Sequence, residues 1–198
     1  MPRTMNRDER KAQLAEAVWR VVLDRGIGAV SVRTVAQEAG VVVGSLRHVF
    51  PTRTELLEFS AELMMQRATE RIVATPPLDD PEEYALAVLR HLLPLEPDSR
   101  AELEVNIALI AEAPALPGLE RIRTEAYEQL GEGCVRVVEM LTGRTRDDRT
   151  VQDARRLHAV VDGLAIHLLV RPASDDPGWA LDIVRAEIAR IAQDADGV

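Results

Sequence analysis

The sequence predicts an all-α protein of about nine helices, arranged as a small N-terminal domain and a larger C-terminal one. Apolar residues recur at i, i+3 and i+4 through most of the 198 residues. Glycines and prolines interrupt this pattern at helix-length intervals, and no segment alternates apolar and polar residues over the length of a strand. These observations favour helices throughout, and a hydrophobic content of 46% provides for a buried core.

The first two helices are predicted from their periodicity and their ends. Residues 8–25 carry one apolar stripe, and Gly26 suits the left-handed conformation that ends many helices. Ser31 is a good N-cap for a short helix over 32–39, and Gly40 stands where that helix would end.

A third short helix is predicted over residues 43–49. The valine run 41–43 has β propensity, but it is too short and too closely bracketed by glycines for a sheet strand. Phe50 precedes Pro51 and is therefore pushed away from helical geometry.

A long fourth helix is predicted from a Thr52 cap over residues 53–74, and Pro76-Pro77 stop it. Amphipathic segments follow, separated by prolines and by Gly143: 82–93, 99–112, 118–142, 150–170 and 178–193. We expect an N-terminal domain over 1–52, a connecting helix over about 53–75, and a C-terminal domain over 76–198.

Charge is unevenly distributed along the chain. The net charge is −9, but residues 1–60 carry nine basic and seven acidic side chains, whereas residues 61–198 carry 15 and 26. Such asymmetry hints at a nucleic-acid-facing N-terminal end. A single cysteine, Cys134, excludes an intrachain disulfide. With no apolar run of membrane-spanning length and no signal-peptide core in the first residues, we expect a cytoplasmic protein that does not bind membranes.

Residues 31–49 have the pattern of a helix-turn-helix. Such a pair needs a small residue where the helices approach, a glycine in the turn and an apolar residue inside the second helix. Ala36, Gly40 and Leu46 meet these needs in order. The pattern directs Ser45, Arg47, His48 and part of the valine run toward solvent, where a helix entering the DNA major groove presents side chains to bases and phosphates.

The block from Arg10 to Leu57, which contains "VSVRTVAQEAGVVVGSLRHVFPTRTELL", resembles the DNA-binding domain of the TetR (tetracycline repressor) family. The resemblance is carried by Gly26, Ser31, Val35-Ala36, Ala39-Gly40-Val41, Gly44-Ser45-Leu46, Phe50, Arg53 and Glu55-Leu56-Leu57. It implies a DNA-binding regulator of transcription, a repressor in the family's usual mode. The predicted DNA-binding residues are Ser31, Arg33, Thr34, Val42, Ser45, Arg47, His48 and Arg53. Among them, Arg53 matches the family's phosphate-binding lysine.

Two positions depart from the family pattern. Val42 stands where the family usually has a serine or threonine that caps the second helix, and valine cannot form that cap. Arg47 stands where the family usually has tyrosine, and an arginine can bind a phosphate or read a guanine edge. Both changes are expected to alter sequence preference rather than abolish DNA binding.

The resemblance further implies a C-terminal domain that binds a small effector and forms a homodimer. Candidate pocket residues are polar or soft side chains on apolar helix faces: Met64, His91, Asn106, Tyr127, Cys134 and His167. The predicted dimer interface is the apolar stripe of the last two helices: Leu157, Val160, Val161, Leu164, Leu168, Ile183, Val184, Ile188 and Ile191. An ordinary intramolecular core is the alternative interpretation of that stripe.

Other classes of function leave little trace in the sequence. The four histidines and the cysteine show no metal-ligand spacing, and nucleotide-binding loops are missing, so we expect no catalytic residues, no metal and no cofactor. An all-helical interaction module whose helix-turn-helix no longer reads DNA stays open as an alternative, because of Val42 and the acidic net charge. Effector, operator and regulated genes are not specified by the sequence.

Overall fold

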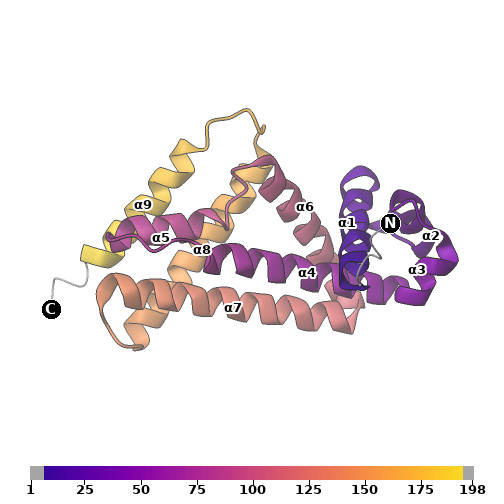
Figure 1. The fold of residues 1–198 in the computed structure, drawn as a ribbon. Helices are drawn as coiled ribbons and strands as arrows, with labels where there is room; N and C mark the ends of the chain where they lie inside the picture. Colours follow the sequence, from indigo (N-terminus) through magenta and orange to yellow (C-terminus); the bar gives the residue numbers. More distant parts are fainter. Residues whose placement is uncertain (1–6, 194–198) are drawn as a thin grey trace. The chain divides into compact units, whose positions relative to one another are not determined.

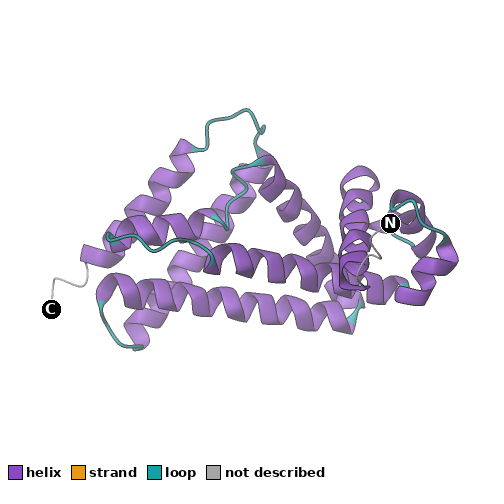
Figure 2. Ribbon diagram, viewed as in Figure 1, coloured by secondary structure: helices purple, strands orange, loops and turns teal. Residues whose placement is uncertain are grey.

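The computed structural model describes residues 7–193, and all regular elements in that range are helices (Figures 1 and 2). The predicted all-α fold is confirmed, with nine α-helices and two short 3-10 helices over the described residues. In chain order they are α1 Arg7–Arg25, η1 Ile27–Ala29, α2 Val32–Glu38, α3 Val43–Val49, α4 Arg53–Val73, α5 Pro81–Arg90, α6 Pro97–Glu112, η2 Ala113–Ala115, α7 Pro117–Thr142, α8 Asp148–Val170 and α9 Gly178–Gln193.

The helix ends follow the signals in the sequence. Gly26 and Gly40, predicted as helix stops, have φ values of 78° and 66°, which favour glycine. The Thr52 hydroxyl accepts from the backbone N–H of Glu55 at 3.1 Å and caps α4 as predicted. Helix α8 begins at Asp148 because Asp147 caps it, with Oδ1 accepting from Thr150 N at 2.7 Å.

The chain folds into two compact units, and their boundary differs from the predicted domain boundary. Unit 1 comprises the described residues up to Arg67 together with Ala101–Thr124, and unit 2 comprises Ala68–Arg100 with the residues from Glu125 onward. Residues 101–124 were expected in the C-terminal domain. They belong to unit 1 because the apolar residues of α6, η2 and early α7 pack into its core.

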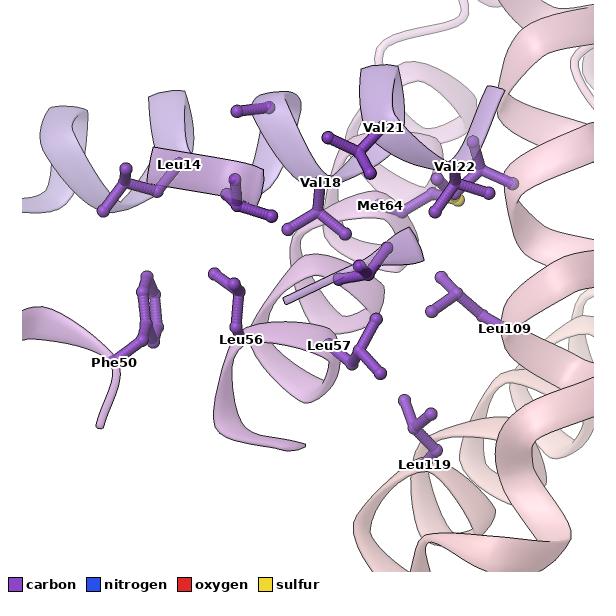
Figure 3. Close-up of a cluster of buried hydrophobic side chains, with 14 of the residues drawn as sticks. Leu14, Val18, Val21, Val22, Phe50, Leu56, Leu57, Met64, Leu109 and Leu119 are labelled. Carbon is purple, nitrogen blue, oxygen red and sulfur yellow. The ribbon is translucent and has the colours of Figure 1, made fainter. Parts of the chain in front are cut away.

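Unit 1 is built around one apolar cluster, in which side chains of α1, α4, α6 and α7 point toward one another (Figure 3). Leu14, Val18, Leu56 and Leu57 are almost completely buried there. Burying a leucine or valine side chain contributes roughly 1.5–3 kcal/mol. The labelled residues of the cluster are Leu14, Val18, Val21, Val22, Phe50, Leu56, Leu57, Met64, Leu109 and Leu119. This cluster supports the helix pair α2 and α3, which packs onto α1 through α2.

Unit 2 places α9 against both α5 and α8. A buried ionic cluster joins the last two helices, since Arg190 Nη2 lies 2.9 Å from Asp153 Oδ1 and 2.7 Å from Glu187 Oε1. Arg100 donates to the final carbonyls of α8, including Leu168 O at 3.0 Å, and so caps that helix end. Within residues 7–193, no helix is both long and apolar enough to cross a membrane.

Candidate nucleic-acid interface

A Schellman turn joins the two short helices α2 and α3. Gly40 N donates to Gln37 O at 3.2 Å and Val41 N donates to Ala36 O at 2.9 Å, which satisfies the last carbonyls of α2. The positive φ of Gly40 permits this geometry without strain. The turn fixes the angle between the helices, as the sequence pattern requires of a helix-turn-helix.

The inner face of the helix pair is buried and the outer face is open to solvent. Val35, Ala36 and Leu46 are fully buried. On the other side Arg47 and His48 are exposed, whereas Ser45 is half-buried. Helix α3 therefore presents a short row of basic and hydrogen-bonding side chains to solvent, which is how a recognition helix meets a duplex.

Val42 lies at the start of this row and is 77% exposed. It occupies the N-cap of α3 with extended backbone, and its side chain makes no capping hydrogen bond. Its carbonyl accepts from Ser45 N at 2.9 Å and from Leu46 N at 3.2 Å. An exposed isopropyl group beside the helix opening is suited to thymine methyl groups in the major groove.

Ser31 and Thr34 form a reciprocal capping box at the start of α2. Ser31 Oγ accepts from Thr34 N at 3.1 Å, and Thr34 Oγ1 accepts from Ser31 N at 2.9 Å. The Thr34 hydroxyl also donates to Ala29 O at 2.7 Å. These two predicted DNA-binding residues thus hold the helix start, and Arg33 between them is exposed.

The side chain of Arg53 is occupied inside unit 1, which sequence reasoning did not foresee. Its Nε donates to Val30 O at 2.9 Å and its Nη2 donates to Ile27 O at 3.2 Å. Its Nη1 lies 3.4 Å from a carboxylate oxygen of Glu112. Three nitrogens of the guanidinium thus already have partners within unit 1, and the role of Arg53 as a phosphate ligand stays a prediction.

Two basic residues near the row lie outside the predicted set. Arg10 on α1 donates to the Ser45 hydroxyl and so joins the first helix to α3. Lys11, the only lysine, lies 5.3 Å from the ring centre of Phe59 and 6.0 Å from that of Phe50. Both are in the block that carries the TetR resemblance, but only folding brings Arg10 to Ser45.

The six candidate effector residues are divided between the two units. Met64 and Asn106 belong to unit 1, and the other four belong to unit 2. Met64 is buried in the core of unit 1, whereas His91, Asn106, Tyr127 and His167 are exposed. The pocket set as a whole stays a prediction. Sequence position on an apolar helix face does not reveal whether a polar side chain points inward.

Cys134 is the one candidate of unit 2 that is buried, and it has the properties of a core residue. Burial in unit 2 and the nearby Asp162 carboxylate raise the pKa of its thiol to about 12. The thiol is therefore neutral at physiological pH and packs as a small apolar group.

Most of the predicted dimer stripe is core within a single chain. Seven of its nine residues are buried: Leu157, Val161, Leu164, Leu168, Val184, Ile188 and Ile191. Val160 is half-buried, and Ile183 is exposed. The alternative interpretation, intramolecular packing, thus describes these seven residues, because α9 packs against α8 and α5 in the same chain.

Across residues 7–193 no group of three or more His, Cys, Asp or Glu side chains has the arrangement of a metal site. His158 Nε2 lies 3.3 Å from Asp162 Oδ2, one turn along α8, so these two residues pair along the helix.

Comparisons with known proteins agree with the geometry of α2 and α3. Residues 14–58 match the model of bacterial regulatory proteins of the tetR family, and residues 81–193 match the C-terminal domain of BetI-type transcriptional repressors. The chain is 33% identical over 181 residues to the HTH-type transcriptional regulator PksA of Bacillus subtilis, covering 87% of this chain and 84% of that protein.

Solved structures show the same likeness. A transcriptional regulator from Rhodococcus sp. superposes with a TM-score of 0.83 at 29% identity, over 95% of this chain and 98% of its own. A regulator from Saccharomonospora viridis in complex with choline superposes with a TM-score of 0.76 at 23% identity, over 94% of this chain and 96% of its own. The exposed recognition helix and these matches together establish that the chain belongs to the TetR family of DNA-binding transcriptional regulators.

Proposed function

We propose that this regulator is a homodimeric repressor that binds a near-palindromic operator and is released from it by a small-molecule effector. The observation that supports the proposal most directly is the solvent-facing row Val42, Ser45, Arg47 and His48 on α3. The row combines an apolar group for thymine methyls, hydroxyl and imidazole groups, and a guanidinium for phosphate or guanine. Repression agrees with the description of the matching C-terminal family.

The dimer is supported by apolar side chains that unit 2 leaves uncovered on its last two helices. Ile166 and Val170 on α8 are 46% and 81% exposed, and Ile183 on α9 is 43% exposed. Exposed alanines, Ala159 on α8 and Ala186 on α9, lie in the same helices and permit close approach of a second copy. A two-fold dimer would present two copies of α3 to half-sites roughly 34–36 Å apart.

Effector control is proposed from the family alone. An effector that binds the DNA-competent and DNA-incompetent states unequally shifts the population between them. A coupling of about 1–3 kcal/mol would change operator affinity roughly 5- to 150-fold. Choline, bound in the Saccharomonospora viridis structure, is a reasonable first compound to add in such a measurement.

The proposal is tested by selecting duplexes from a random-sequence pool with the purified protein. We expect an enriched inverted repeat, a steep fall of affinity with salt, and a dimer in sedimentation. Ile183→Glu should yield a monomer that binds the same duplex weakly, whereas Leu23→Glu, an equally exposed apolar position on α1, should stay dimeric. No enriched sequence would instead favour a helix-turn-helix that no longer reads DNA, and an enriched single half-site would contradict the dimer.

A further inference from the structure

Arg53 joins three elements of unit 1 through one guanidinium group. It is the first residue of α4. Its bonds to Ile27 O and Val30 O capture carbonyls of the turn between α1 and α2, and its contact with Glu112 reaches the last residue of α6. The side chain is 34% exposed, so these contacts are partly shielded from water.

The turn between α1 and α2 explains why an arginine is suitable here. The 3-10 helix η1 and Val30 place several carbonyls at this turn, and Ile27 O already accepts from Val30 N at 3.1 Å, which leaves its second lone pair for another donor. The Thr34 hydroxyl donates to Ala29 O, and the Arg53 guanidinium donates to Ile27 O and Val30 O. A planar guanidinium donates in several directions from a rigid fork, whereas a lysine ammonium is a single compact donor group. Arginine can therefore hold two carbonyls and a carboxylate together.

Glu112 supports the same arrangement from the C-terminal end of α6. It is the final residue of α6, where the helix dipole is negative, and the last turn of α6 contains no basic residue. The Arg53 guanidinium supplies the missing positive charge at 3.4 Å. The carboxylate in turn holds the guanidinium away from solvent and toward the turn.

From these contacts we infer that Arg53 is a positioning residue for DNA reading, and that Glu112 holds it in place. The pair fixes the turn from which α2 starts, and through the α2–α3 packing it fixes the orientation of the recognition helix. This assignment differs from a phosphate contact by Arg53. It makes Glu112, which lies far from the helix-turn-helix in sequence, a determinant of DNA affinity.

The test compares Glu112→Gln, Arg53→Lys and their double variant, using a duplex enriched from a random pool by the wild-type protein. Binding is measured over a range of salt concentrations, at a temperature where circular dichroism shows every variant folded. Glu55→Gln is the matched control, because it removes the same charge near the start of α4 from a residue that bonds Thr52 rather than Arg53. Hydrogen exchange of residues 27–34 is measured without DNA.

If Arg53 positions the turn, Glu112→Gln weakens binding by up to roughly fivefold, with an unchanged salt slope. Arg53→Lys should cost about as much despite keeping its charge, and the double variant should be no weaker than Arg53→Lys alone. Exchange over 27–34 should accelerate in Glu112→Gln but not in Glu55→Gln. If Glu112→Gln binds the duplex as tightly as the wild-type protein or more tightly, and Arg53→Lys keeps the full duplex affinity, the inference is overturned and Arg53 is better described as a phosphate ligand.

The outcome stays informative if the wild-type protein enriches no duplex. The proposed operator recognition would then fail, and the exchange measurement alone would decide the role of the pair. Faster exchange over residues 27–34 in Glu112→Gln would show that the Arg53–Glu112 pair stabilises the turn between α1 and α2. Unchanged exchange would overturn the inference.

Discussion

Replacing Val42 by threonine should stabilise the protein, although the residue lies on the predicted DNA-binding surface. Val42 has the extended backbone of an N-cap, with φ −69° and ψ 135°, but no side-chain acceptor. Threonine has nearly the same shape and tolerates the same backbone angles. Its hydroxyl oxygen can accept from a first-turn backbone N–H of α3, which supplies the missing cap.

The size of the effect follows from capping and exposure. A serine, threonine, asparagine or aspartate cap contributes about 0.5–2 kcal/mol relative to a non-capping residue. The valine methyl that is lost contributes little in its place, because the side chain is 77% exposed and a fully buried methyl group is worth only about 0.8 kcal/mol. We therefore expect a net gain of roughly 1 kcal/mol, or about 2–4 °C in Tm for a chain of this size.

Thermal unfolding followed by circular dichroism measures this gain, at fixed protein concentration because oligomerisation affects Tm. Val43→Thr is the matched control. It makes the same chemical change one residue later, where the side chain packs against the core of unit 1 and occupies a helical position. Its unfolding free energy should fall or stay level. An unchanged or lower Tm for Val42→Thr would refute the capping argument.

Four further outcomes are expected. Ser31→Ala removes one half of the capping box and should cost about 1 kcal/mol of unfolding free energy, whereas Ser31→Asp should retain most of it. Arg47→Ala should weaken binding to all duplexes alike and reduce the salt slope by about 1, and a sequence-selective loss would instead assign Arg47 to a base edge. The backbone N–H of Thr150 lowers the pKa of Asp147 below its ordinary value of 3.8, so the carboxylate adds stability above pH 3.8 that is lost as pH falls through the lowered pKa. The difference in unfolding free energy between the wild-type protein and Asp147→Asn should therefore shrink in acid. A difference that does not change with pH would contradict this reasoning. Cys134 should resist iodoacetamide at pH 7 until denaturant exposes it, since its thiol has a pKa of about 12 and is buried; rapid labelling of the native protein would contradict that placement.

Helix positions were predictable because their signals are local. Ser31, Gly26 and Gly40 act through their own backbone and nearest neighbours, and the structure places each as the sequence indicates. Helix α8 begins two residues before the predicted segment 150–170, because Asp147 caps it. The identity of α3 as an exposed helix also followed, since Gly40 and Leu46 leave only one face for the core.

The faces of the later helices were less predictable, because an apolar stripe has the same period whether it meets its own chain or a second one. Leu157, Val161 and Ile188 were assigned to a dimer interface and are buried by neighbouring helices of one chain. The exposed Ile166 and Val170 were omitted from that set. Distinguishing the two cases requires knowing which helices pack together, and periodicity carries no such information.

Arg53 shows a different limit. The sequence pattern predicted that Arg53 is the first residue of the fourth helix, and the structure confirms this position. The direction of the Arg53 side chain, however, depends on acceptors in the α1–α2 turn and on Glu112, which is 59 residues away in sequence. A guanidinium bonds to a carbonyl oxygen, a carboxylate or a phosphate through the same N–H groups. Internal acceptors can therefore hold a basic residue of a recognition motif, as two carbonyls and a carboxylate hold Arg53.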